Sequence, residues 1–174
     1  MFARVFILVL LMTCCFAACT SGSKSNKNSQ SAPSQPSLDA KDSEGNTPLL
    51  RAVNSGDTIE ITRLVEAGAN VNAETNSGVT PLMNAAGMGN KEAVELLIKK
   101  GADVNHRTSG NYTPLMQAAL VGQTEIVRIL LDAGADPTVK DTGGRTAATY
   151  AEESKHPDLA KLLKEKVTQA AGKR

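Results

Sequence analysis

Histidine and cysteine are the residue types that most often hold a metal ion, and this chain has few of them in useful positions. His106 and His156 lie 50 residues apart, and neither has a second ligand one helical turn away. The three cysteines, Cys14, Cys15 and Cys19, all lie near the amino terminus. The spacing therefore predicts no metal site of the usual His and Cys kind, and no bound cofactor.

One carboxylate stands in a context that could indicate catalysis. Asp141-Thr142-Gly143 matches the active-site tripeptide of aspartic proteases, which need two such carboxylates to share one proton. The tripeptide occurs once, where a turn is expected, so we interpret Asp141 as a turn residue. A phosphate-binding Gly-rich motif and Gly-x-Ser-x-Gly are both absent from the sequence. The sequence predicts a non-catalytic protein without a small-molecule substrate, and an enzyme is the disfavoured alternative.

The elements that carry these residues recur with a period of 33 residues. Thr47-Pro48-Leu49 returns as Thr80-Pro81-Leu82 and Thr113-Pro114-Leu115, and after another 33 residues comes the weakened copy Thr146-Ala147-Ala148. The aliphatic positions keep the same period, as in Leu64, Leu97, Leu130 and Leu163. Units this short cannot bury a core alone, so they must stack on one another.

Each unit has the signals of two short helices. The Thr is suited to cap the first helix, and Pro follows at the first helical position, where its missing N–H costs nothing. In the second unit, Gly89 is expected to end the first helix and Asn90 to cap the second. Gly101 then ends that helix. Small alanines on the first helix and larger aliphatic residues on the second allow neighbouring pairs to pack closely.

The pattern Thr-Pro-Leu, Ala-Ala, Gly, Glu-Ile-Val, Leu-Leu, Gly-Ala-Asp, most complete from Thr113 to Pro137, resembles the ankyrin repeat. The resemblance implies an all-α fold, an ankyrin-repeat solenoid of four helix-turn-helix repeats joined by β-turn loops. The domain is expected at residues 39–168 and is followed by a frayed tail at 169–174. The repeats are expected at about residues 42–74, 75–107, 108–140 and 141–168.

The sequence departs from the family pattern in two places. The family usually has His after Thr-Pro-Leu, where it is hydrogen-bonded between repeats, but this chain has Leu50, Met83 and Met116. Cohesion at these positions must therefore come from packing. The fourth unit loses Thr-Pro-Leu and has Lys155 where the others have glycine, so we interpret it as the C-terminal cap. Its last helix is expected to start at Pro157.

Residues 1–18 have the pattern of a secretory signal peptide. Arg4 precedes an apolar run from Val5 to Leu11, and small residues lead up to Cys19. The stretch from Val5 to Ala18 has 14 residues, fewer than the roughly 20 that a spanning helix needs. We therefore expect export and not an uncleaved membrane span.

Phe16-Ala17-Ala18-Cys19 resembles a bacterial lipobox, although Phe16 replaces the usual Leu. The resemblance implies a lipid anchor on Cys19 and a place in the periplasm. Thr20, where inner-membrane retention would require Asp, implies the outer membrane. After Cys19, the rest of the segment 19–38 is rich in Ser, Asn, Gln and Pro, as in a disordered tether. Cleavage to a soluble exported protein is the alternative.

The overall charge gives no indication of nucleic-acid binding, because 19 basic residues face 18 acidic ones. The C-terminal part from Thr138 is more basic, with 8 basic and 5 acidic residues. A basic end could contact anionic lipid. We prefer the simpler interpretation of a solvated capping helix.

The resemblance implies that a protein partner, in the periplasm or envelope, binds a concave groove formed by the turns and the exposed side of each first helix. Carried over by register, the candidate positions are Asn76, Val79, Asn84, Gly87, Met88, Tyr112, Gln117, Leu120, Val121, Arg145 and Tyr150. Solvent-facing positions that are polar in the first unit become apolar in the middle two, which favours a contact site. Sideways packing of Leu120 and Val121 onto the next repeat is the alternative.

Gly87 lies inside a predicted helix, where glycine costs about 1 kcal/mol relative to alanine. Close approach of a partner backbone would give this glycine a use. The role we favour is an adaptor or scaffold. An inhibitor or immunity protein that caps a periplasmic hydrolase or toxin is the alternative.

Overall fold

The computed structural model describes residues 37–171. The signal peptide, Cys19 and nearly all of the tether lie outside the described residues. Within residues 37–171 the chain forms helices and turns, without a β-strand. The helices are α1 (Pro48–Ser55), α2 (Thr58–Glu66), α3 (Pro81–Met88), α4 (Lys91–Lys99), α5 (Pro114–Val121), α6 (Thr124–Asp132), α7 (Ala147–Glu153) and α8 (Pro157–Ala171).

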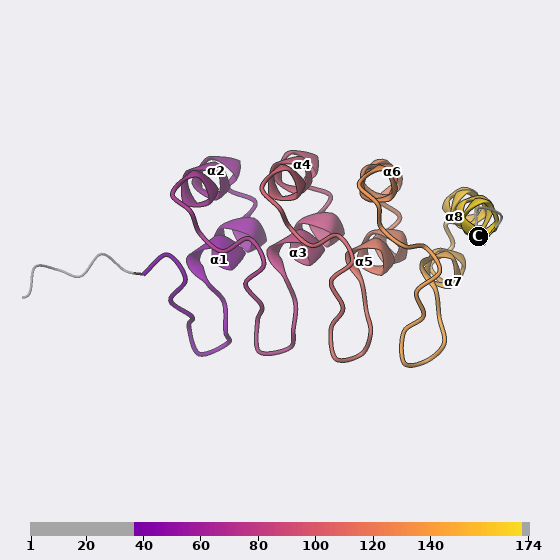
Figure 1. The fold of residues 1–174 in the computed structure, drawn as a ribbon, viewed down its shortest axis with the longest axis horizontal. Coiled ribbons are helices and arrows are strands. Elements are labelled where there is room, and N and C mark those ends of the chain that lie inside the picture. Colours follow the sequence, from indigo (N-terminus) through magenta and orange to yellow (C-terminus); the bar gives the residue numbers. More distant parts are fainter. Residues whose placement is uncertain (1–36, 172–174) are drawn as a thin grey trace, which may run out of the picture. The chain divides into compact units, whose positions relative to one another are not determined.

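The helices form two rows, as the sequence predicts for a stack of helix pairs (Figure 1). The inner helices α1, α3, α5 and α7 pack side by side, and the outer helices α2, α4 and α6 form the second row. Helix α8 packs on α7 and completes the fourth pair. Between successive pairs, the chain extends into a long turn on the side of the inner helices, away from the outer row. No helix within residues 37–171 combines the length and apolar character needed to cross a bilayer.

Local capping explains why the inner helices begin where they do. The hydroxyl oxygens of Thr47, Thr80, Thr113 and Thr146 each accept a hydrogen bond from the backbone N–H three residues later. Proline occupies the first turn of α1, α3 and α5. These three helices end at glycines in the left-handed conformation, Gly56, Gly89 and Gly122. The predicted start and stop signals are therefore confirmed.

The core is continuous through all four pairs. It joins small alanines of the inner helices, such as Ala85 and Ala118, to aliphatic side chains of the outer helices, such as Leu97 and Leu130. Leu50, Met83 and Met116, which replace the histidine expected from the family pattern, are at most 2% exposed. Cohesion at these positions comes from packing, as predicted.

Two asparagines add a second kind of link between repeats. The side chain of Asn72 donates to the carbonyl of Gly101 and accepts from the backbone N–H of Asp103. Asn105, 33 residues later, makes the same two bonds with Gly134 and Asp136. Each side chain therefore links the segment that follows one outer helix to the segment that follows the next outer helix. The bridging role of these asparagines was not predicted from the sequence.

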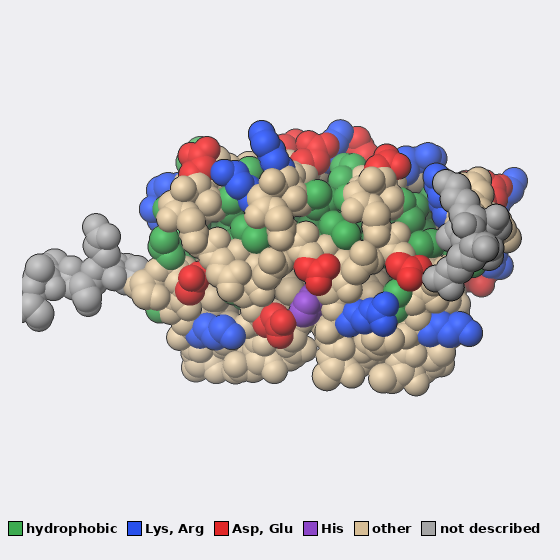
Figure 2. All heavy atoms as spheres, in the orientation of Figure 1, with side chains coloured by type: hydrophobic (Ala, Val, Ile, Leu, Met, Phe, Trp, Pro, Cys, Tyr) green, Lys and Arg blue, Asp and Glu red, His purple; other side chains and the backbone are tan. Residues whose placement is uncertain are grey.

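The tips of the turns are joined in pairs. The backbone N–H of Asn76 donates to Glu44, and that of Thr142 donates to Gly110. Between residues 75–79 and 108–112 no backbone hydrogen bond is formed, and Figure 2 shows a notch that separates the turns into two blocks. His106 bridges the repeats near this point. Its Nε2 lies 2.9 Å from the carbonyl oxygen of Gly78, so Nε2 carries the proton.

The fourth repeat differs from the others at its carboxyl end. Helix α8 starts at Pro157, as predicted, and continues through residues 169–171, where the sequence predicts a frayed tail. Lys155 stands at the position of Gly56, Gly89 and Gly122 and adopts the same left-handed conformation, with φ of 62°. Both end repeats also carry a basic residue where the repeats between them are apolar. Arg63 of the first repeat aligns with Leu96, and Lys164 of the fourth aligns with Leu131. This agrees with capping repeats at both ends of the stack.

Candidate protein-binding face

The surface of the inner helices and turns carries most of the exposed large apolar side chains. Across residues 37–171 four such side chains are exposed, and three of them belong to the candidate set: Met88 at 50%, Leu120 at 39% and Val121 at 44%. Met88 ends α3, and Val121 occupies the same position in α5. Leu120 and Val121 keep a substantial part of their surface open, so packing onto the next repeat does not cover them fully. We call the exposed surface of the inner helices α1, α3, α5 and α7 and their preceding turns the inner face.

The other predicted positions at this face differ in their exposure. Val79, Asn84 and Gln117 have intermediate exposure, whereas Asn76 and Arg145 are exposed. Asn84 donates from Nδ2 to the side-chain oxygen of Asn54, over 2.7 Å. The amide groups of adjacent repeats therefore lie next to each other along the face.

Gly87 serves the packing of neighbouring repeats. A Cβ atom at this position would lie 2.6 Å from Nε2 and 3.1 Å from Cγ of Gln117 in the next inner helix. The side chain of Gln117 thus occupies the space that we assigned to a partner backbone. The glycine is explained by the close packing of α3 and α5.

Tyr150 does not lie on the open surface, and the expectation that it faces solvent is wrong. Its side chain is 6% exposed, and its hydroxyl donates a 2.6 Å hydrogen bond to Oδ2 of Asp141. The ring meets that of Tyr112 edge-on, with centroids 5.3 Å apart and planes at 88°. The hydroxyl of Tyr112 is also buried, and no hydrogen-bond partner is present for it within the described residues. We therefore leave Tyr150 out of the inner face.

Both carboxylate oxygens of Asp141 are engaged by donors of the fourth repeat. Oδ1 accepts from the backbone N–H of Gly143 and of Arg145, and Oδ2 accepts from Tyr150 and the Arg145 guanidinium. The hydrogen bond from Tyr150, together with the backbone and guanidinium donors of Arg145, lowers the pKa of Asp141 to about 2. This carboxylate shapes the turn and anchors α7, in agreement with its interpretation as a turn residue.

Arg145 closes this cluster toward the solvent. Its guanidinium carbon lies 4.5 Å from the centroid of the Tyr150 ring, and Nη1 lies 3.7 Å from a carboxylate oxygen of Glu153. We call Tyr112, Asp141, Arg145 and Tyr150 the tyrosine cluster. Neither its ion pair nor its tyrosine contacts could be predicted from the sequence, because Asp141 and Arg145 flank a turn, where a spacing of four residues does not by itself bring side chains together.

The charge distribution divides the inner face into a central part and two ends. The candidate positions of the second and third repeats carry no charged side chain. In the first repeat Arg51 pairs with Asp42 at 3.5 Å, and in the fourth Arg145 pairs with Asp141 at 2.9 Å. These candidate positions therefore offer an uncharged apolar and amide surface, with the exposed Glu74 and Arg107 in the turns nearby, and this surface is suited to contact with another macromolecule. Among the described residues no group of three or more His, Cys, Asp or Glu could hold a metal ion.

Comparison with known proteins gives two matches to family models. The model described as ankyrin repeats (3 copies) matches residues 15–108, and the model described as ankyrin repeats (many copies) matches residues 97–151. Together the two matches extend through the inner face and most of the stack. A search of the curated proteins gives no match.

Proposed function

The chain belongs to the ankyrin-repeat family, whose repeats imply protein–protein interaction, and from this premise we propose that it binds a partner protein through the inner face. The observation that carries the proposal is the exposure of Met88, Leu120 and Val121 on adjacent inner helices. Soluble proteins rarely leave contiguous apolar side chains open without a contact to make. The family is typically non-catalytic, which fits recognition by a rigid surface.

The chemistry of the inner face indicates what the partner should offer. Its candidate positions in the second and third repeats are apolar or carry amides, as Leu120, Asn84 and Gln117 do, and none of them is charged. A matching partner surface has apolar side chains at its centre and polar groups that can bond to side-chain amides. A strongly acidic or basic segment would lose its hydration here without gaining an ion pair. Binding should therefore depend little on salt concentration.

The first experiment compares two charge insertions at exposed apolar residues. Leu120→Glu places a carboxylate in the middle of the inner face, whereas Ile59→Glu changes a residue that is 85% exposed on α2. Glu92 and Glu125 occupy the position of Ile59 in the next two repeats, so the control should fold normally. In a quantitative pull-down, Leu120→Glu should reduce partner recovery at least tenfold, as expected for a central contact worth more than about 1.4 kcal/mol.

Equal recovery of the partner by wild type, Leu120→Glu and Met88→Glu would disprove the assignment of the inner face. Loss of recovery with Ile59→Glu as well would show that binding requires a different or larger surface. We propose an adaptor role, in which the bound partner keeps its own activity. If the partner is a hydrolase or toxin that loses its activity on binding, the protein is an inhibitor or immunity protein.

We further propose that the protein is exported and held in the periplasm, at the outer membrane, by lipid on Cys19. The support is the sequence of residues 1–19, with Arg4, an apolar run and small residues before the cysteine. Several acyl chains anchor a protein far more firmly than one. The tether after Cys19 would leave the repeats free to meet an envelope partner.

Membrane fractionation tests the anchor. Cys19→Ser should move the protein from the membrane to the soluble fraction, because the lipid has no other cysteine to attach to in the mature chain. Cys15→Ser, four residues earlier, is the matched control and should leave fractionation unchanged. If Cys19→Ser remains in the membrane fraction, the protein is not anchored by this cysteine.

A further inference from the structure

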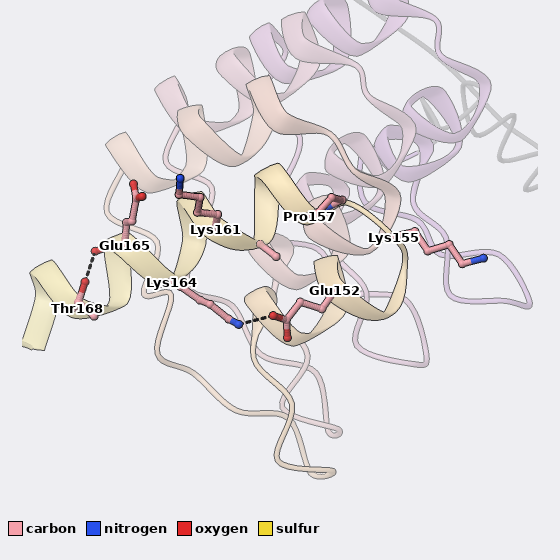
Figure 3. Close-up of a pocket in the computed structure, with 8 residues that line it drawn as sticks. Glu152, Lys155, Pro157, Lys161, Lys164, Glu165 and Thr168 are labelled. Carbon is pink, nitrogen blue, oxygen red and sulfur yellow. Dashed lines mark hydrogen bonds and ion pairs between the residues drawn. The ribbon is translucent and has the colours of Figure 1, made fainter.

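The C-terminal end of the stack presents an open hollow along α8. The hollow has a volume of about 850 Å³ and is lined by residues from the end of α7, the following turn and α8. Pro157 and the stems of Lys161 and Lys164 frame it (Figure 3), and Ala160, which is nearly buried, contributes little surface. The hollow lies at the opposite end of the repeat series from α1 and α2 and is separate from the inner face.

The hollow lies along the last outer helix, so a further helix is the kind of element that could pack on it. Val65 of α2, Ile98 of α4 and Leu131 of α6 are aligned with Lys164 of α8. Outer helices pack on the next outer helix along the stack, α2 on α4 and α4 on α6. Helix α8 has no following helix among the described residues, and Lys164 makes this face more polar than the matching faces of α2, α4 and α6. A helix that stacks here must therefore be held by charge as well as by packing.

The charges on this surface are only partly satisfied. Lys164 pairs with Glu152 of α7. Lys161 and Glu165 lie one helical turn apart and extend to the same side of α8 (Figure 3). Neither forms an ion pair with another described residue, and the same is true of Lys155 at the start of the hollow. An occupant with an acidic group opposite Lys161 and a basic group opposite Glu165 would complement them.

We propose that α8 of a second copy of this chain occupies the hollow, antiparallel to the first and related to it by a two-fold axis. An antiparallel pair centred between Lys161 and Glu165 places Lys161 of each copy opposite Glu165 of the other. A two-fold contact uses one surface twice, so a lysine and a glutamate one turn apart become two ion pairs. In the same arrangement Lys155 lies at the C-terminal end of the second α8, where the helix dipole favours a cation.

The length of α8 supports this packing. It has 15 residues, whereas the other outer helices have 9. The additional turns extend the contact along an antiparallel partner to about 22 Å at 1.5 Å per residue. A contact made mainly by one helix face is smaller than a standard interface of about 800 Å² per partner. The dimer should therefore be weak and should form reversibly with concentration.

The test is sedimentation velocity of the unprocessed full chain over a concentration series, in a mild detergent that shields its apolar segment Val5 to Leu11. Wild type should shift from monomer to dimer as concentration rises. Lys161→Glu and Glu165→Lys should each weaken the dimer roughly tenfold or more, because each converts two attractive pairs into two repulsive ones. The double variant Lys161→Glu/Glu165→Lys restores opposite charges across the axis and should recover dimerisation.

Recovery in the double variant separates this proposal from a general effect of charge. Lys41→Glu, an exposed lysine at the other end of the stack, makes the same charge change as Lys161→Glu and should leave the dimer intact. Helical circular dichroism should be equal in all variants. The proposal is overturned if wild type stays monomeric at every concentration, if the single reversals have no effect, or if the double variant does not recover. Binding to anionic vesicles in the absence of a dimer would also overturn it and assign the lysines to a lipid surface.

Discussion

At the scale of single residues, the tyrosine cluster shows how the same side chain can be used in two ways. Tyr150 donates its hydroxyl hydrogen to Asp141, and Arg145 lies over its ring. Tyr112 contributes only its ring, because its buried hydroxyl has no partner among the described residues. A hydrogen bond to a charged group stabilises by about 1.5–3 kcal/mol, whereas an unpaired buried hydroxyl stabilises nothing.

The two tyrosines should therefore respond differently to removal of the hydroxyl. Tyr112→Phe should leave the free energy of unfolding unchanged or slightly higher, since it removes an unpaired polar atom and keeps the edge-on ring contact. Tyr150→Phe should lower it by about 1–3 kcal/mol, because Asp141 loses a donor. Urea unfolding of both variants measures the difference. A larger loss of unfolding free energy in Tyr112→Phe than in Tyr150→Phe would show that the hydroxyl of Tyr112 has a hydrogen-bond partner in solution.

The tyrosines also predict a response to alkaline pH. Burial raises the pKa of Tyr112 from 10.0 to about 12, and burial together with the Asp141 hydrogen bond raises the pKa of Tyr150 to about 12. Because both pKa values are higher in the folded protein, this contribution to stability is complete below pH 10 and is lost as the pH rises toward 12. The chain has two tyrosines and no tryptophan, so phenolate absorbance reports this pair alone. If the two phenols of the native protein titrate near pH 10, they are not buried as the tyrosine cluster requires.

At the scale of helices, the ends of the inner helices show the effect of a single backbone conformation. Gly56, Gly89 and Gly122 end α1, α3 and α5 with positive φ, and Lys155 follows α7 with φ of 62°. A residue with a Cβ atom in this conformation is strained by about 1 kcal/mol relative to glycine. The fourth repeat therefore carries a local strain that the other three avoid.

Replacing this lysine should stabilise the fold. Lys155→Gly should raise the free energy of unfolding by about 0.5–1 kcal/mol, because the left-handed conformation costs glycine little.

The opposite change, from glycine to alanine, should destabilise the other repeats. A Cβ atom at position 56 would meet nothing within 4 Å, so Gly56→Ala should lower the free energy of unfolding by about 1 kcal/mol through backbone strain alone. Gly122→Ala should cost more, because its Cβ atom would lie 2.4 Å from the His156 ring. Thermal unfolding of dilute protein gives all three values. An equal loss of unfolding free energy in Gly56→Ala and Gly122→Ala would show that the His156 ring moves aside.

The helices were predictable because their signals are local. The Thr caps, the prolines and the terminal glycines act within a few residues, and the 33-residue period aligns them from one repeat to the next. The burial of Tyr150 and the contact of Gln117 with Gly87 were not predictable in this way. Register fixes the position of a side chain along the stack, but its final direction depends on the space left by the adjacent repeat.

At the scale of the whole stack, cohesion is uneven. The helices form one continuous core from α1 to α8, whereas the tips of the turns are joined by backbone hydrogen bonds only within the first and last pairs among residues 37–171. Each repeat gains most of its stability from its neighbours. The continuous core should therefore hold the four repeats together as a single unfolding unit, despite the gap between the second and third turns.

A cavity in the first repeat tests this cooperativity. Leu49 is fully buried in α1, and Leu49→Ala should lower the free energy of unfolding by about 2–5 kcal/mol. Helical circular dichroism reports all repeats, whereas tyrosine fluorescence reports the third and fourth, which contain Tyr112 and Tyr150. If the stack unfolds as one unit, both signals should shift to lower urea concentration by the same amount. A dichroism transition that splits while the tyrosine midpoint stays fixed would show that the first repeat unfolds separately, because its contacts with α3 are then too weak to couple the two ends.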